Sequence, residues 1–329
     1  MYLDTKPVSC KSLGDYFQVD GKLLDEQYRD HLSNFRNWSQ LEHATDWILF
    51  EDNIGPNLSI DETALSKGEL YTIITNKEAK GKKGALLAMV KGTNSEKVIE
   101  VLKKIPEWKR NAVKEVTLDM AASMEKIVRK SFPKASLVTD RFHVQKLAYE
   151  AVQELRIQYR WEAMELENKE IELSKELKKK FIPDILENGD TLKQLLARSR
   201  YLLFKSESSW SPSQVHRAEI LFRRYPAIEQ AYKLSIQLGH IFHTAKNKGV
   251  AFTRLAQWYN AVEEAGFKSF NTIAKSIEAH YLTILNYFDN RSTNASAESF
   301  NAKIKAFRAA FRGVKNSSFF LFRLSNIYA

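Results

Sequence analysis

Three short apolar runs open the segment that decides the fold: LSID at Leu58–Asp61, LYTIIT at Leu70–Thr75 and ALLAMV at Ala85–Val90. Glycine, lysine and asparagine residues separate these runs, which is typical of antiparallel strands joined by turns. A helix capped by Ser95 follows to Leu102, and the chain then alternates strand, helix and strand between Val113 and Thr139. Such alternation predicts a parallel unit next to the antiparallel strands.

The order of strands and helices is that of the ribonuclease-H-like fold, which has three strands, a helix, a strand, a helix and a strand. The last three elements are expected at Val113–Leu118, Ala121–Ser131 and Ser136–Thr139. From His143 to about Asn290 no run is typical of a strand, and the charge spacing in Glu172–Lys180 favours helices. We predict an α/β mixed-sheet core interrupted by a large all-α insertion of six to eight helices.

These elements divide the chain into four predicted regions. Residues 1–57 form a helical lead-in for DNA or partner binding, in which Leu32, Phe35, Trp38 and Leu41 recur at helical spacing. Residues 58–145 are the first part of the catalytic core, and 146–290 are the all-α insertion domain. Residues 291–329 complete the core with a helix that carries Glu298.

Three carboxylates stand in separate, recognisable settings. Asp61 and Asp119 each close an apolar strand, while Glu298 opens a basic helix near the end of the sequence. The strands that end in Asp61 and Asp119 are neighbours in this fold, so both side chains can share a cation. Carboxylates suit hard cations, and two ions about 3.5–4 Å apart can activate water and stabilise the leaving oxygen of a phosphodiester. We predict two Mg²⁺ (or Mn²⁺) ions on Asp61, Asp119 and Glu298. The alternative is that the aspartates are turn residues and that Glu298 only stabilises its helix.

The helix that carries Glu298 has two distinct faces. One arc holds Glu298, Asn301, Lys305, Arg308 and Arg312, and an arc about 110° away holds Phe300, Ile304, Phe307 and Phe311. We expect the aromatic arc to pack on the sheet. Residues 291–329 contain seven lysines and arginines and one acid, which predicts a track for DNA phosphates. A solvated basic face is the alternative. The predicted DNA contacts here are Lys303, Arg308 and Arg312, with Asn301 and Lys305 supporting the site.

Two further groups of residues have a weaker signal. Asp140 and His143 follow the last predicted strand, and His143 is expected to order the turn into the next helix or to be a buried structural histidine. Arg198, Arg200 and Lys205 flank Trp210 and are predicted to line a DNA channel. Trp210 is expected to pack in a core, with base stacking as the alternative.

Composition limits the class of protein. The chain has 329 residues, a formal net charge of +10 and one cysteine, Cys10. The positive charge favours nucleic acid as a partner, and a single cysteine excludes an internal disulfide and a cysteine-based zinc site and suits a reducing cytoplasm. No apolar run is long enough for a bilayer span and the first residues lack a signal-peptide pattern, so we expect no membrane partner.

Three runs together resemble a known family: TLDM at Thr117–Met120, FPKASLVTDRFHVQKL at Phe132–Leu147 and YFDNRSTNASAESFNAKIK at Tyr287–Lys305. They are similar to the DDE transposases of bacterial insertion sequences, within the ISL-type group and its Aon-type elements. The resemblance extends from about Leu32 to the last residue and includes RYLLFK at Arg200–Lys205.

The resemblance implies the function of the site residues. It makes Asp61, Asp119 and Glu298 the DDE triad of an enzyme that cleaves element ends and joins them to target DNA. Asp140 and His143 match a DxxH signature, which makes Asp140 the rival of Asp119 for the second catalytic position. It also implies double-stranded DNA, a homodimer or larger assembly, and a nucleoid-associated place in the bacterial cytoplasm.

One departure from the family affects partners. Many relatives carry an amino-terminal cysteine-rich zinc module and a helix-turn-helix that reads the element ends, and neither is found in this sequence. Residues 1–57 or a separate DNA-binding protein are expected to supply this reading. Two alternatives stay open: an inactive DNA-binding scaffold, which would show no carboxylate-dependent binding of Mn²⁺, and a ribonuclease-H-like nuclease or resolvase, which would cleave without joining.

Overall fold

The computed structural model describes residues 2–65, 68–311 and 313–329. The chain divides into two compact units: Met1–Asp140 with Asn290–Ala329, and Arg141–Asp289. The second unit nearly coincides in extent with the predicted insertion at 146–290. Among the described residues, no helix has the length and apolar character needed to cross a membrane.

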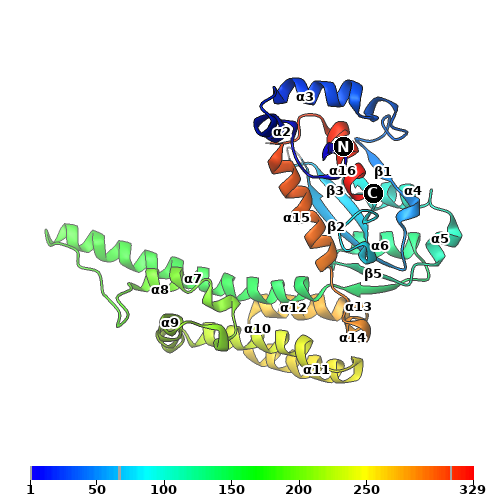
Figure 1. The fold of residues 1–329 in the computed structure, drawn as a ribbon. Helices are drawn as coiled ribbons and strands as arrows, with labels where there is room; N and C mark the ends of the chain where they lie inside the picture. The colour runs from blue at the N-terminus through cyan, green and yellow to red at the C-terminus, as the bar shows by residue number, and fades with distance from the viewer. Residues whose placement is uncertain (1, 66–67, 312) are drawn as a thin grey trace. The chain divides into compact units, whose positions relative to one another are not determined.

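The first unit is built on a six-stranded mixed sheet (Figure 1). Its strands are β1 (Trp47–Leu49), β2 (Asn57–Ala64), β3 (Leu70–Asn76), β4 (Leu86–Lys91), β5 (Glu115–Leu118) and β6 (Ser136–Thr139). They lie in the order β1-β4-β3-β2-β5-β6. The pairs β1–β4, β4–β3 and β3–β2 are antiparallel, whereas β2–β5 and β5–β6 are parallel. This is the ribonuclease-H-like mixed sheet that the sequence predicts.

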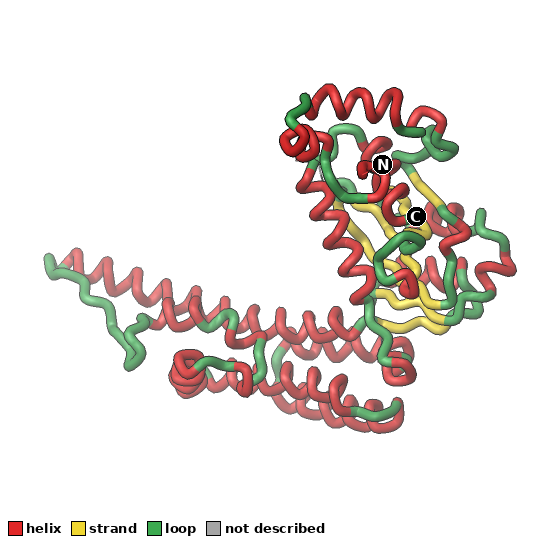
Figure 2. The backbone as a smooth tube through the Cα atoms, in the orientation of Figure 1, coloured by secondary structure: helices red, strands yellow, loops and turns green. Residues whose placement is uncertain are grey.

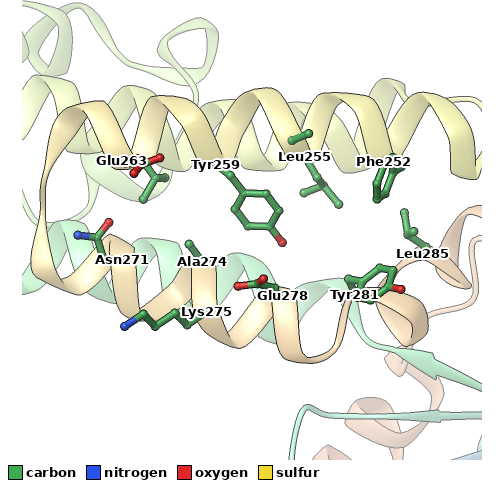
Figure 3. A pocket seen from close by; sticks show the side chains of 12 residues that line it. Phe252, Leu255, Tyr259, Glu263, Asn271, Ala274, Lys275, Glu278, Tyr281 and Leu285 are labelled. Carbon is green, nitrogen blue, oxygen red and sulfur yellow. The ribbon is translucent and has the colours of Figure 1, made fainter.

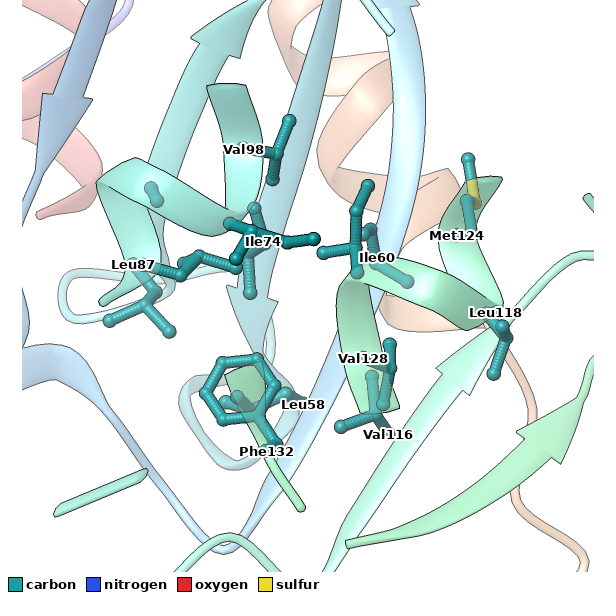
Figure 4. Close-up of a cluster of buried hydrophobic side chains, with 14 of the residues drawn as sticks. Leu58, Ile60, Ile74, Leu87, Val98, Val116, Leu118, Met124, Val128 and Phe132 are labelled. Atoms are coloured by element: carbon teal, nitrogen blue, oxygen red, sulfur yellow. The ribbon is translucent and has the colours of Figure 1, made fainter. Parts of the chain in front are cut away.

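Helices cover both faces of the sheet because apolar side chains alternate along its strands. On one face α4 (Ser95–Leu102) and α6 (Ala122–Ser131) contribute to a buried cluster that includes Leu58, Ile60 and Leu118 (Figure 4). A shorter helix, α5 (Glu107–Asn111), precedes β5. The opposite face is covered by α15 (Ala295–Ala310) and α16 (Ser317–Tyr328). The predicted aromatic arc of α15 is confirmed, since Phe300, Ile304 and Phe307 are at most 1% exposed and pack with β3 and β4.

The amino-terminal region differs from the expected helical lead-in. Its helices are α1 (Tyr2–Thr5), α2 (Cys10–Phe17) and α3 (Gly21–Gln27). The prediction of a helix from the spacing of Leu32, Phe35, Trp38 and Leu41 is wrong. The helical structure described here is limited to a π turn at Tyr28–Leu32 and a 3-10 turn at Phe35–Asn37. The apolar spacing instead reflects packing of Phe35, Trp38 and Leu41 with Phe319 and Phe322 of α16. Strand β1 then pairs with β4 at the sheet edge.

Arg323 of α16 is buried and cannot belong to the predicted DNA track. Its side chain is 0% exposed. Nη2 donates to the carbonyl oxygens of Lys6 at 3.4 Å and Val8 at 3.1 Å. The guanidinium lies 5.2 Å from the ring centre of Tyr28 and 5.5 Å from that of Phe311. A count of cations along the sequence fails here because it does not show which side of α16 faces the core.

Cys10 is expected to be inert toward thiol reagents in the folded protein. It is 1% exposed, and burial, together with the nearby charge of Asp25, raises the pKa of Cys10 to about 12. Since the thiolate is the reactive form, only roughly 1 in 10,000 molecules would carry it at pH 8. Titration with a disulfide reagent at pH 8 should give no reaction in minutes and one thiol per chain after addition of urea. Rapid stoichiometric labelling of the native chain would contradict this prediction.

The second unit is entirely helical within the described residues of Arg141–Asp289 (Figure 2). Its helices are α7 (Arg141–Glu176), α8 (Leu192–Arg198), α9 (Pro212–Arg224), α10 (Pro226–Thr244), α11 (Lys248–Ala265), α12 (Lys268–Ala279) and α13 (Tyr281–Leu285), with α14 (Tyr287–Asn290) at its end. Trp258 is the largest fully buried side chain, and its Nε1 donates to the carbonyl of Leu234 at 2.9 Å. The predicted core role of Trp210 is confirmed, because its ring packs with Tyr232 and its Nε1 donates to Leu202 at 2.8 Å.

Candidate active site

The strand register brings Asp61 and Asp119 together. Parallel pairing of β2 with β5 sets Ser59 opposite Thr117, and two further residues along each strand lead to Asp61 and Asp119. Side chains two apart on a strand share a face, and neighbouring strands are about 4.7–4.9 Å apart. Both aspartates are half-buried. Asp119 directly follows β5, whereas the expected strand end at Asp61 is wrong, because pairing with β3 continues β2 to Ala64. The two aspartates therefore lie side by side on the sheet face that α15 covers.

Helix α15 reaches this pair through Asn301. Its Nδ2 donates to Asp61 Oδ2 at 2.7 Å and to the carbonyl of Glu62 at 3.4 Å. Asp61 Oδ1 accepts from the backbone N–H of Glu62 at 2.8 Å, and Asp119 Oδ1 accepts from that of Ala121 at 2.8 Å. These hydrogen bonds fix the orientation of both carboxylates. Each carboxylate oxygen can accept more than one bond, so acceptor capacity is left for a cation.

Glu298 occupies the first turn of α15 and is exposed. It precedes Asn301 by three residues, and side chains at that spacing are neighbours on a helix surface. Its backbone N–H donates to the carbonyl of Asn294 at 3.0 Å, and the fully buried Asn294 donates to the carbonyl of Ile60 at 3.4 Å. The start of α15 is thereby attached to β2 one residue before Asp61.

Asp140 directly follows β6, as Asp119 directly follows β5, but Asp140 is more deeply buried than Asp119. The β5–β6 register pairs Leu118 with Thr139, so the next residues, Asp119 and Asp140, are level. The Asp140 N–H donates to the carbonyl of Leu118 at 2.8 Å, and Asp140 is 0% exposed. The rival acids thus differ in burial: Asp119 is partly open to solvent and Asp140 is not.

Glu62 is an acid whose surroundings the sequence reasoning missed. Strand alternation assigned it to the face opposite Asp61, which set it apart from the site. Nevertheless, burial, the charge of Asp119 and then the charge of Asp61 all raise the pKa of Glu62. Negative charge therefore gathers around Asp61 and Glu62 in the second half of β2, which strand alternation alone does not reveal.

This arrangement has the donor chemistry for a divalent cation, although it is not a closed site. Carboxylate oxygens converge from β2 and β5, and the raised pKa of Glu62 records their repulsion. Within residues 2–65, 68–311 and 313–329, however, no three acidic, histidine or cysteine side chains are grouped closely enough to hold one ion. Glu298 therefore does not form a compact three-ligand group with Asp61 and Asp119 in this structure. A bound cation would offset the repulsion among Asp61, Glu62 and Asp119.

Two of the basic side chains predicted to bind DNA instead attach α15 to the backbone of the first unit. Lys303 Nζ donates to the carbonyl of Gly81 at 2.7 Å. Arg308 Nη1 donates to the carbonyls of Ala64 at 3.1 Å and Leu65 at 2.9 Å. Lys305 is exposed, and Arg312 lies outside the described residues.

The other predicted positions belong to the second unit. His143 is half-buried in the first turn of α7, and Arg200 and Lys205 are exposed. The Arg200 guanidinium lies 5.5 Å from the ring centre of Tyr201. A groove of about 800 Å³ runs between α11 and α12 (Figure 3), where Tyr259, Glu263 and Glu278 are among its lining residues. None of the predicted site residues lines this groove.

Comparisons with known proteins show the family to which this chain belongs. The transposase for insertion sequence element IS1001 from Bordetella parapertussis is 21% identical over 292 residues, which are 88% of this chain and 61% of that protein. The chain therefore spans less than two thirds of the length of this curated relative. A family model described as transposase, of the DDE type of the ISL3 group, matches residues 58–324, which is most of the chain. The resemblance predicted from the sequence is confirmed, and the chain belongs to the ISL3-type DDE transposases.

Proposed function

We propose that this chain cleaves the ends of an insertion sequence and joins them to target DNA, with Asp61, Asp119 and Glu298 as its catalytic triad. The observation that carries the proposal is the placement of Asp61 beside Asp119 on neighbouring parallel strands, where Asn301 from the helix of Glu298 binds Asp61 at 2.7 Å. Family membership and the relative named for an insertion sequence element support DNA as the substrate.

Asp61, Asp119 and Glu298 would hold two Mg²⁺ or Mn²⁺ ions. When bound, such ions activate a water and stabilise the leaving oxygen of a phosphodiester. The chain's own residues orient the carboxylates that this chemistry needs. Asn301 orients Asp61 and the turn at Ala121 orients Asp119. Glu298 lies one helical turn before Asn301 on the same surface of α15. First water cleaves a phosphodiester at the element end and releases its 3′-OH. That 3′-OH then attacks a target phosphate, and the target's own P–O3′ bond breaks, so its 3′-oxygen leaves as a new 3′-OH.

Burial favours Asp119 over Asp140 as the second catalytic acid, since a ligand must be reached by both cation and phosphate. Asp119→Asn should lower strand cleavage by at least about a thousandfold, which corresponds to several kcal/mol of transition-state stabilisation. Asp140→Asn should lower the free energy of unfolding. It should leave the cation concentration that gives half-maximal cleavage nearly unchanged. Cleavage rates measured over a Mn²⁺ series, beside thermal unfolding of each variant, separate the two roles. A folded, active Asp119→Asn enzyme would reverse the assignment.

Double-stranded DNA is the proposed partner, and a net charge of +10 favours it. Lys305 in α15 and the exposed Arg200 and Lys205 are the proposed phosphate contacts. Since two element ends must be paired, we propose a homodimer or larger assembly, with sequence reading by residues 1–57 or a separate protein. The site of action is then the bacterial chromosome.

A joining assay tests this proposal. The substrate is a duplex oligonucleotide with the boundary sequence of the element that encodes the chain, incubated with plasmid DNA and Mn²⁺. Transfer of a labelled 3′-OH strand into the plasmid is the expected result. Cleavage without transfer would favour a nuclease or resolvase, and DNA binding without either reaction, and without Mn²⁺ binding by calorimetry, would favour an inactive scaffold.

A further inference from the structure

Lys77 connects three segments that are distant in sequence. It opens the 3-10 turn Lys77–Ala79 after β3, and its side chain is only 15% exposed. Its Nζ donates to Ser292 Oγ at 2.7 Å, to Thr117 Oγ1 at 2.8 Å and to Glu115 Oε1 at 3.3 Å. An ammonium group has three donor hydrogens, so these three acceptors use all of them.

The acceptors lie directly behind the carboxylate pair. Glu115 and Thr117 precede Asp119 by four and two residues on β5, so all three share one face of the strand. Burial lowers the pKa of Lys77, whereas the charges of Glu115 and Asp140 oppose that shift. The ammonium is therefore a positive charge that acts on two acids, Glu115 and Asp140.

Ser292 gives this centre its connection to α15. It belongs to the short segment between Asn290 and the first residue of α15, Ala295. The same segment also has Asn290, whose Nδ2 donates to Glu115 Oε2 at 3.4 Å. The segment is thus held on β5 at two points before the helix begins, and Glu298 follows six residues after Ser292.

We infer that Lys77 is a positioning residue for Glu298: it ties Ser292 to β5 and so fixes where the first turn of α15 starts beside Asp61 and Asp119. The inference rests on the proposed catalytic role of Glu298. Asn301 holds the helix one turn beyond Glu298, and Lys77 holds the chain before it, so the glutamate lies between two fixed points. Loss of the earlier point leaves two longer bonds before Glu298, both of 3.4 Å, from Asn290 to Glu115 and from Asn294 to Ile60. The first turn then loosens, while Phe300 and Ile304 keep the rest of α15 packed.

The direct test is hydrogen exchange in the cation-free full chain. Lys77→Met and Ser292→Ala should each speed exchange of the Glu298 amide by about five- to tenfold, the loss expected from one or two hydrogen bonds. Amides near Phe307 should be unaffected. Ser292→Ala keeps the Lys77–Glu115 pair, and Lys77→Met combined with Glu115→Gln leaves no unpaired buried acid. The control is Lys91→Met, which removes an ion pair with Glu69 whose side chains are 41% and 40% exposed.

The expected catalytic consequence is slower strand cleavage with nearly unchanged DNA affinity. The kcat for strand cleavage should fall about 10- to 100-fold in Lys77→Met, while the Kd for DNA changes less than about twofold. In the Ser292→Ala background, adding Lys77→Met should lower kcat little further, because both changes remove the contact between Lys77 and Ser292. Unchanged exchange at Glu298, or wild-type kcat in Ser292→Ala and Lys77→Met, overturns the inference. A wild-type chain that joins no DNA, or an active Asp61→Asn variant, overturns the proposed function and leaves the exchange result as a separate answer.

Discussion

Asp61→Asn is expected to lower strand cleavage and joining by at least about a thousandfold while DNA binding stays within about twofold of the wild type. Asparagine has nearly the shape of aspartate, so Asn301 still has an oxygen to bond. The substitution removes the negative charge that would hold a cation, and with it the stabilisation of the phosphodiester in the transition state. Glu298→Gln should have a comparable effect.

The measurement is a single-turnover cleavage assay at saturating protein, paired with a gel-shift titration of the same duplex. Asp52→Asn is a matched control, because its side chain is 90% exposed and pairs with Lys109 at the surface of the same unit. It should cleave at the wild-type rate. Cleavage by Asp61→Asn within tenfold of the wild type would remove Asp61 from the triad.

Arg323→Ala is expected to reduce the free energy of unfolding of the first unit by about 2–4 kcal/mol. The change removes charge-assisted hydrogen bonds to two backbone carbonyls and the contact with aromatic rings, and leaves a cavity between them. Part of the loss is offset because a buried guanidinium is costly to desolvate, and burial correspondingly lowers the pKa of Arg323. Arg323→Met should therefore be less damaging than alanine.

Urea unfolding followed by tryptophan fluorescence and by circular dichroism would measure this loss, with the two probes checking whether both units unfold together. The control is Arg36→Ala, since that side chain is 67% exposed in its pair with Asp30 and should change stability by less than about 0.5 kcal/mol. An Arg323→Ala protein as stable as the wild type would show that the desolvation cost cancels every contact of the guanidinium.

The sheet could be predicted from the sequence because its strands follow local rules. The runs at Leu58, Leu70 and Ala85 are apolar, short and bounded by turn residues, and the strands begin within two residues of these positions. Strand β1 was missed, since Trp47–Leu49 has three residues and becomes a strand only through pairing with β4. Tertiary pairing of this kind leaves no periodic signal.

The candidate site divides in the same way. Asp119 directly follows β5 and Glu298 lies in the first turn of α15, where sequence signals are strong, whereas Asp61 lies inside β2 and was recognised by the apolar run before it. Lys77 and Glu115 could not be found, because their link joins residues 38 apart and then reaches Ser292 on the far side of the insertion. Lys303 and Arg308 were predicted from their charge to bind DNA. The sequence does not show that both donate hydrogen bonds to backbone carbonyls of the first unit instead.

The discontinuity of the first unit has a consequence for how the protein is made. Its sheet is complete once Thr139 has left the ribosome, yet the helices that cover one face come from Asn290–Ala329. A nascent chain thus presents Ile73, Met89 and their neighbours to solvent, or to a chaperone, throughout translation of the next 150 or so codons. Since the proposed catalytic Glu298 also lies in Asn290–Ala329, polypeptides cut short within Arg141–Asp289 would lack it and would be prone to aggregate.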